Sequence, residues 1–384
     1  MAEPASVFLV TESMLMIQQL AQEFAEKELR PLVMKYDESQ EFPSEIMSKL
    51  GKIGFLGALF PEEYEGAGLT PLDFTVLVEE ISRVDPSVAL GICAHNGLCT
   101  NHIFTFGSDA QKRKYLPDLC SGRKLGGWGL TESASGSDAG GMQSSARRKG
   151  NGWVINGSKA FTTHGSVGST FVVMAVTGSV EGKPAISAFI LEKGMTGLSA
   201  GRKENKLGMR ASDTSTLVMD DVEVPAENII GREGEGFRQA LQVLDGGRIG
   251  IAALSVGLAQ GALDASLHYA RERRQFGRPL AEFQAVQWKL ADMATEIEAA
   301  RLLTRKAAWL RMQGQSVNLA ASQAKYFASE VAVRAANEAV QIHGGYGFIK
   351  DFPVEKFYRD AKLLTIGEGT SEVQKIVIAK NLLR

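Results

Sequence analysis

The chain has 384 residues, too many for one ordinary hydrophobic core, so two or three packed regions are expected. Hydrophobic residues make up 44% and charged residues 22%, the balance of a soluble globular protein. The formal net charge of -2 disfavours nucleic acid as a partner, and the absence of an apolar run of about 18 residues disfavours a membrane span.

The first ten residues, MAEPASVFLV, carry neither the features of a secretory signal nor the Arg-rich pattern of a transit peptide. The cysteines Cys93, Cys99 and Cys120 are too few, and odd in number, for a disulfide framework. We therefore expect a bacterial cytoplasmic location, or a mitochondrial matrix location if the sequence is a mature form.

Helical spacing dominates the first third of the chain. Thr11 is a candidate N-cap, because apolar residues recur at helical spacing from Met14 to Phe24, and Pro31 interrupts or ends this helix. Further helices are predicted over residues 44–53, 71–84, 87–106 and 110–121.

The middle of the chain changes to β-strand character. Residues 153–155 and 158–163 flank Asn156-Gly157, the strongest short hairpin signal, so a hairpin is predicted there. Strands are also predicted over 170–177, 186–191 and 215–224. After Pro225 the pattern predicts long helices over 236–273, 282–313 and 318–341. This order, helical then β then helical, is not the alternation of a Rossmann sheet.

Two glycine clusters, 231–236 and 344–347, look like phosphate loops, but neither follows a strand in a βαβ unit, which argues against a Rossmann dinucleotide site. Ser137 has no base nearby in sequence, and the chain lacks G-x-S-x-G, so a hydrolase is disfavoured.

A possible metal site involves Cys93, His95, Cys99 and His102. Positions 95, 99 and 102 would share one face of a helix, but Cys93 would not, and no carboxylate completes the set. We interpret these residues as part of a small-residue helix that lines a core or pocket, and predict no metal.

Eight segments carry a family resemblance: LTESASGSDA (130–139), KAFTTHG (159–165), KLGMRASDT (206–214), LDGGR (244–248), RERRQFG (271–277), QIHGGYG (341–347), YRDAK (358–362) and GEGTSE (367–372). Together, in this order, they resemble the acyl-CoA dehydrogenase family, and most of all its short-chain and branched-chain members. The resemblance covers essentially the whole chain.

The resemblance implies an α+β fold of three domains: an N-terminal α-helical domain (1–124), a middle β-barrel domain (125–232) and a C-terminal four-helix bundle (233–384). It also implies an FAD cofactor, an acyl-CoA substrate, and an electron-transferring flavoprotein as electron acceptor. The expected assembly is a homotetramer built as a dimer of dimers.

Glu368 matches the family's catalytic base. Removing the α-proton of a thioester requires hydrogen bonds that stabilise the developing enolate, and a carboxylate whose pKa is raised by burial. In relatives the donors are a flavin ribityl hydroxyl and the backbone N–H of this glutamate. The flanking Gly367 and Gly369 would allow an unusual backbone path and close approach of substrate. The alternative is a turn carboxylate at a helix start, with capping through Thr370 or Ser371.

Other motif residues match cofactor or substrate contacts. In the β region, flavin contacts are implied for Leu130, Thr131, Gly136, Ser137, Phe161 and Thr163. Contacts to the FAD pyrophosphate and adenosine half, across a dimer interface, are implied for Arg273, Gln275, Phe276, Gln341, Gly344, Gly345 and Thr370. Contacts to the thioester and CoA are implied for Ser137, Asp245 and Arg248, although an intrahelical salt bridge is an alternative for the last two.

Three departures from the family pattern bear on specificity. Phe161 stands where most relatives have Trp, which keeps an aromatic face without the indole N–H. Gly247 stands where some relatives place their glutamate base, so no rival base is expected there. Gly367 replaces the usual tyrosine, which predicts a short acyl chain with tolerance for branching.

Two other functions on this fold stay open. An acyl-CoA oxidase or flavin monooxygenase would be reoxidised rapidly by oxygen. A DNA-associated, non-catalytic member is disfavoured by the acidic balance, the intact Glu368 and the lack of a basic C-terminal extension.

Overall fold

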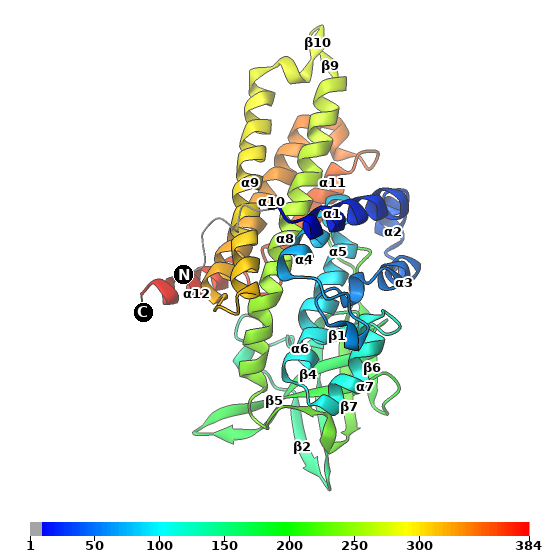
Figure 1. Ribbon diagram of the computed structural model, residues 1–384, viewed down its shortest axis with the longest axis vertical. Coiled ribbons are helices and arrows are strands. Elements are labelled where there is room, and N and C mark those ends of the chain that lie inside the picture. The colour runs from blue at the N-terminus through cyan, green and yellow to red at the C-terminus, as the bar shows by residue number, and fades with distance from the viewer. Residues whose placement is uncertain (1–9, 384) are drawn as a thin grey trace.

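The computed structural model describes residues 10–383, which form a helical N-terminal part, a β-sheet and a C-terminal helical bundle (Figure 1). This order confirms the predicted α+β fold class. Residues 1–9, on which the targeting expectation depends, lie outside the described range.

The N-terminal part is a set of short helices. Thr11 caps the first helix as predicted, because its side chain accepts a hydrogen bond of 3.1 Å from the Met14 N–H. The helix predicted over 87–106 contains a π-helical segment, His95–Thr100, in its middle. The helices are α1 (Glu12–Phe24), α2 (Val33–Ser39), α3 (Ser44–Lys52), α4 (Pro71–Val84), α5 (Pro86–Ala94), α6 (Asn101–Phe106) and α7 (Asp109–Cys120).

The β part is one curved sheet with an apolar cluster on each face. Trp153, Phe171 and Phe189 lie in the cluster that the sheet encloses, and Val172 and Met174, on the other face, pack against the helices. The strands are β1 (Gly126–Gly129), β2 (Ser145–Lys149), β3 (Gly152–Thr163), β4 (Thr170–Val180), β5 (Lys183–Glu192), β6 (Leu198–Lys203), β7 (Thr214–Val224) and β8 (Ile229–Ile230). Their order is β6-β7-β3-β2-β4-β5-β8, and β1 pairs with β4.

The hairpin predicted at Asn156-Gly157 is wrong. Both residues lie inside the continuous strand β3, where the register with β7 shifts. Asn156 pairs with Asp221 through two hydrogen bonds of 2.8 and 2.9 Å, and a Cβ at Gly157 would lie 2.3 Å from Ser144 Oγ. The dipeptide therefore serves a bulge and a close approach between neighbouring strands, because tertiary packing overrides its turn preference.

The C-terminal part is built around the 37-residue helix α8 (Gly236–Glu272), which packs against α4, α9 and α10. It runs from the sheet to a small hairpin at the opposite end of the molecule (Figure 1). The remaining elements are β9 (Arg274–Gln275), β10 (Arg278–Pro279), α9 (Gln284–Met312), α10 (Asn318–His343), α11 (Val354–Leu364) and α12 (Ser371–Leu382).

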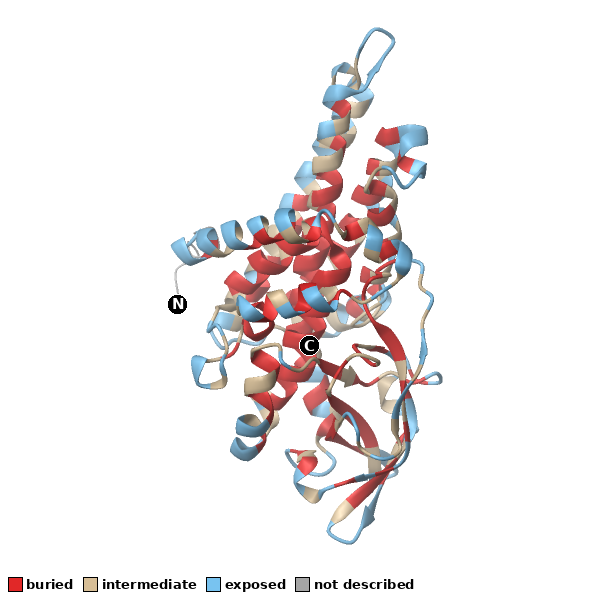
Figure 2. Ribbon diagram, turned by 90° about the vertical axis from the view of Figure 1, so that its right-hand side faces the viewer, coloured by how far each residue is buried: buried red, intermediate tan, exposed pale blue. Residues whose placement is uncertain are grey.

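By length and composition α8 could cross a membrane, contrary to the expectation that no segment would qualify. However, 83% of its most apolar 18-residue window is buried inside the protein, and Figure 2 shows the helix passing through the buried centre. This burial explains its apolar composition, since a core helix is hydrophobic on nearly all sides.

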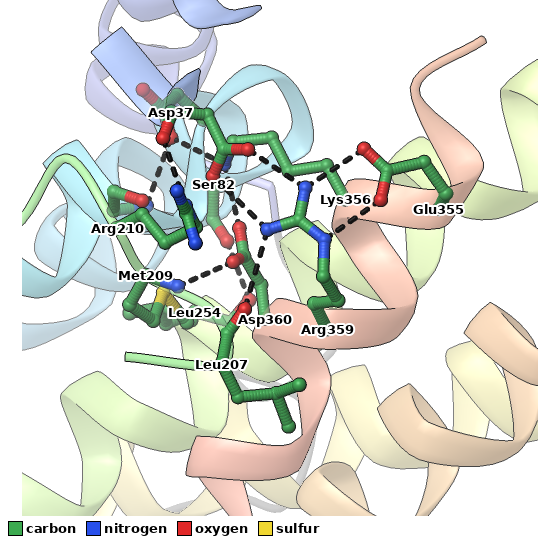
Figure 3. Close-up of polar contacts among 12 residues, drawn as sticks. Asp37, Ser82, Leu207, Met209, Arg210, Leu254, Glu355, Lys356, Arg359 and Asp360 are labelled. Atoms are coloured by element: carbon green, nitrogen blue, oxygen red, sulfur yellow. Dashed lines mark hydrogen bonds and ion pairs between the residues drawn. The ribbon is translucent and has the colours of Figure 1, made fainter. Parts of the chain in front are cut away.

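A buried charge cluster joins α11 to the two other parts of the chain (Figure 3). Arg359 donates a 2.7 Å hydrogen bond to Asp37 of α2. Lys356 donates to Asp360 at 2.6 Å, and the Asp360 carboxylate accepts the backbone N–H of Met209 from the loop before β7. We call this set the interdomain charge cluster. It fixes the helix that leads to Glu368 against the sheet.

Candidate active site

Glu368 lies in the short connection between α11 and α12, which we call the base loop. It has a left-handed backbone with φ of 52°, followed by Gly369 with φ of 95°. A left-handed non-glycine residue is strained and persists only where its surroundings hold it. Here Gln374 Nε2 donates to the carbonyls of Glu368 and Gly369 at 3.2 and 3.0 Å, and Lys325 Nζ donates to the Gly369 carbonyl at 2.7 Å.

The Glu368 carboxylate points at α8 rather than at its own loop. A Cβ at Gly247 would lie 2.3 Å from Glu368 Oε2, and Leu98 lies beside the same point. This oxygen is buried and has no hydrogen-bond partner among residues 10–383. Burial raises the pKa of Glu368 to about 7, against the opposing charges of Arg248 and Lys325. The result is a desolvated carboxyl group that titrates near neutral pH.

The alternative interpretation of this segment was a helix cap, and a residue next to the base, not Glu368 itself, provides that cap. Thr370 is the N-cap of α12, and its hydroxyl accepts the Val373 N–H at 3.3 Å. The Glu368 N–H donates to no acceptor in the described part of the chain. It is therefore a free donor next to the carboxylate.

The pair Asp245–Arg248 forms the intrahelical salt bridge that the sequence left as an alternative. Arg248 Nη1 lies 2.7 Å from Asp245 Oδ1, which also accepts a 2.9 Å hydrogen bond from Asn318. Burial raises the pKa of Asp245 and lowers that of Arg248. The buried Arg248 Nε has no partner within the described residues, so this guanidinium retains a donor for a ligand.

An apolar wall adjoins the base. Leu98 and Val243 form a buried cluster with the partly buried Trp128 and Leu244. The Trp128 ring is fixed because its Nε1 donates to His102 Nδ1 at 3.1 Å, and His102 Nε2 lies 3.0 Å from Gln239 Oε1. Trp128 was not predicted as a site residue, although an aromatic residue between glycines in a strand is a usable signal.

The predicted flavin residues lie on β3 and on the segment after β1. Phe161 has a left-handed φ of 54° and is 65% exposed, so its ring is available to a ligand. The Ala160 N–H donates to the Thr131 carbonyl at 2.8 Å, which places the two segments side by side. Leu130 is buried, Thr163 is partly buried, and a Cβ at Gly136 or Gly345 would meet open space.

A buried pair that sequence analysis missed supports the segment containing Ser137. Lys159 Nζ lies 2.5 Å from Glu132 Oε1, and the Glu132 carboxylate also accepts the backbone N–H groups of Gln143 and Ser144 at 2.6 and 3.0 Å. Ser137 itself is exposed, which leaves its hydroxyl free for a ligand.

The residues predicted for the adenosine half gather at the far end of α8. A cavity of about 580 Å³ is lined by Arg273, Gln275, Gly344, Gly345 and neighbours that include Tyr346. The Arg273 guanidinium lies 5.3 Å from the Tyr346 ring centroid. Three predicted contacts are not in this lining: Gln341 and Phe276 are exposed beside it, and Thr370 is at the base loop.

The residues present suit the two halves of FAD, but in two separate places on the chain. An exposed aromatic ring and open glycines suit an isoalloxazine, and a cavity with an arginine and a glycine pair suits a pyrophosphate and adenosine. The first place lies beside the sheet and the second at the far end of the bundle.

The cysteine and histidine side chains between Cys93 and His102, for which no metal was predicted, make separate contacts. Cys93 Sγ lies near Gly250 on α8, His95 bonds to the Leu119 carbonyl and the Gly126 N–H, and His102 bonds to Trp128. These side chains therefore serve separate packing and hydrogen-bonding roles.

An α+β fold that carries a carboxyl group with a pKa near 7 and an exposed aromatic ring on the sheet is consistent with the class of flavoprotein oxidoreductases. The chain matches the N-terminal, middle and C-terminal domains of acyl-CoA dehydrogenase over residues 11–123, 127–222 and 234–383. It belongs to the acyl-CoA dehydrogenase family and is an enzyme of that family.

Two kinds of relative illustrate the similarity. The short-chain specific acyl-CoA dehydrogenase of Clostridium acetobutylicum is 47% identical over 377 residues, 98% of this chain and 100% of that protein. The butyryl-CoA dehydrogenase structure from Megasphaera elsdenii has a TM-score of 0.96 at 43% identity and covers 98% of this chain and 99% of its own.

A chain in a structure of the electron transferring flavoprotein of Acidaminococcus fermentans, from work on flavin-based electron bifurcation, also has a TM-score of 0.96. It is 47% identical, and the match covers 98% of this chain and 99% of that chain.

Proposed function

We propose that this enzyme oxidises a short acyl-CoA thioester to its trans-2-enoyl-CoA, with Glu368 as the base. The observation that carries the proposal is the Glu368 carboxyl group, whose buried Oε2 lies against Gly247 and whose pKa is raised to about 7. A base whose pKa lies near the working pH is substantially ionised and still binds a proton strongly.

In the proposed reaction Glu368 takes the α-proton of the thioester. The free Glu368 N–H stabilises the negative charge that develops on the thioester oxygen, because a fixed donor in a desolvated site interacts strongly with an oxyanion. FAD, when bound, supplies the acceptor for the hydride that leaves the β-carbon. Proton and hydride together account for the two hydrogens removed.

Gly367 supports a short chain that can be branched. A Cβ at this position would lie 3.6 Å from the nearest atom, the Leu363 carbonyl oxygen, so there is room that a larger side chain would fill. One turn along α8, a Cβ at Gly250 would lie 3.2 Å from Cys93 Sγ, so α8 and α5 pack closely there. We infer a pocket that is wide near the reacting carbons and shallow beyond them.

The FAD cofactor is proposed to span two subunits. Arg248 lies in α8, and Arg273, 25 positions later, is the C-cap of that helix. At a rise of 1.5 Å per residue, the two residues are about 38 Å apart along the helix axis. The predicted flavin residues lie beside the sheet, where α8 begins, and the predicted adenosine residues lie at its far end, which supports a site whose two ends come from different chains. The proposal therefore includes a dimer, and two such dimers would form the homotetramer. The Acidaminococcus similarity supports an electron-transferring flavoprotein as acceptor.

The test is an anaerobic titration of the FAD-loaded protein with acyl-CoAs, followed by flavin absorbance. Bleaching by butyryl-, isobutyryl-, isovaleryl- or 2-methylbutyryl-CoA, abolished in Glu368→Gln, is expected. Equal or better turnover of butyryl-CoA than of all three branched substrates would contradict the branching proposal. Absence of bleaching by any substrate would refute the dehydrogenase proposal, and rapid reoxidation by oxygen would indicate an oxidase or monooxygenase.

A further inference from the structure

Lys325 is a buried cation next to the base loop. Its side chain, on α10, is 0% exposed and lies in a helix face of small residues, with Ala321, Ala324 and Ala328 close along the helix. The ammonium donates a 2.7 Å hydrogen bond to the Gly369 carbonyl and makes no other hydrogen bond among the described residues. An ammonium has three donors, so this group is buried with most of its bonding capacity unused.

A second incomplete polar group belongs to the same loop. Glu368 Oε2 is buried without a hydrogen-bond partner in the described chain, and Glu368 directly precedes Gly369, whose carbonyl accepts the Lys325 hydrogen bond. The other charged or titratable groups that act on this pair are Arg248 from α8, Cys93 from α5, Glu330 from α10 and Glu372 from α12. Arg248 is already paired with its own carboxylate, whereas Lys325 makes no ion pair among these residues.

We propose that Lys325 is a positioning residue for the reaction: it pins the base loop at Gly369 and supplies the charge that balances the Glu368 carboxylate. This inference rests on the proposed role of Glu368 as the base. Burial lowers the pKa of Lys325 to about 8 and raises that of Glu368 to about 7, and each charge opposes the other's shift. Near pH 7.5 the two groups can therefore be charged together.

Three variants separate the two parts of this role. Lys325→Met keeps the length of the side chain but removes both the donor and the charge. Lys325→Gln removes the charge and retains an N–H donor. The matched control is Gln374→Leu, which removes hydrogen bonds to the carbonyls of Glu368 and Gly369 without changing any charge.

The experiment measures the rate of anaerobic flavin reduction against pH, together with the carboxyl band of Glu368 by infrared difference spectroscopy in the FAD-loaded enzyme. The band is assigned by its loss in Glu368→Gln. Both Lys325 variants are expected to raise the titration midpoint by about one pH unit or more, and so to slow reduction about tenfold at pH 6. Gln374→Leu should slow the reaction at every pH and leave the midpoint unchanged.

A midpoint that stays unchanged in both Lys325 variants would overturn the proposal, even if the proteins lost stability. Failure of the underlying function would look different: the wild-type flavin would not bleach, or Glu368→Gln would still react. The infrared midpoint is independent of turnover, so it still tests the Lys325 charge in that case.

Discussion

At the scale of single residues, the rate of flavin reduction should follow the ionisation of Glu368. Because burial raises its pKa to about 7, the reactive carboxylate forms as pH rises through that value. We expect the rate with saturating substrate to rise about tenfold per pH unit below 7 and to level off above it. Stopped-flow absorbance under anaerobic conditions measures it. A rate independent of pH from 5 to 7 would contradict this assignment.

The same ionisation should destabilise the folded protein. A carboxyl group whose pKa is raised from 4.5 to about 7 on folding stabilises the fold below pH 4.5, and this contribution is lost as pH rises through 7. Glu368→Gln should therefore be more stable than wild type at pH 8, by about 3 kcal/mol at most. Urea unfolding at pH 8 and pH 5 tests this, and the advantage should shrink at the lower pH.

Gly247 should be essential for the position of the base. In Gly247→Ala the new methyl group would lie 2.3 Å from Glu368 Oε2, so the carboxylate has to move. Displacing a catalytic group by about 1 Å can lower a rate by about a hundredfold, and we expect a loss of that order in flavin reduction with FAD content unchanged.

The control for Gly247→Ala is Gly250→Ala, one turn along the same helix. Its methyl group would lie 3.2 Å from Cys93 Sγ and 3.7 Å from Phe74, and does not approach Glu368. It should affect stability more than the rate. Similar rate losses in both variants would indicate a general disturbance of α8 and not a contact with the base.

At the scale of elements, α11 places the base loop against the sheet through the interdomain charge cluster. Lys356 is buried between Asp85 and Asp360, with contacts of 3.0 and 2.6 Å. In Lys356→Met both carboxylates remain buried without their cation, so we expect the free energy of unfolding to fall by about 3 to 5 kcal/mol. Thermal or urea unfolding provides the measurement. Wild-type stability in this variant would show that the cluster is not a buried ion-pair network.

Local patterns predicted most elements because they need little beyond hydrophobic spacing and end signals. The helix over 71–84 has the predicted bounds, since Thr70 and Asp73 form a capping box around Pro71. Strands β1, β2 and β6 were not predicted, and β1, rich in glycine, owes its place to pairing with β4. Short strands of this kind depend on neighbours distant in sequence.

At the scale of the whole molecule, the separation of the two cofactor regions predicts complementation between subunits. Arg273→Ala and Glu368→Gln should each be inactive alone, the first through loss of FAD. In a mixed dimer one site combines a normal Glu368 with the partner's normal arginine. Co-expression in equal amounts should therefore recover about a quarter of wild-type activity, because half of the dimers are mixed and each has one complete site.

Activity of the mixed protein per mole of subunit is the measurement, with each variant purified alone as the control. A mixture as inactive as its components would mean that each FAD is held within one chain, and would contradict the proposed dimer.

The sequence was enough to indicate the family, the order of helical and β parts, and the residues of the eight motifs, because these depend on local spacing and on short sequence motifs. Only the tertiary structure brought Gly247 of α8 to Glu368 and Lys325 of α10 to Gly369, from helices far from the base loop along the chain. It also showed that Asn156-Gly157 is a bulge. The physical reason is that burial, pKa and close packing arise from contacts between segments, which no local pattern encodes.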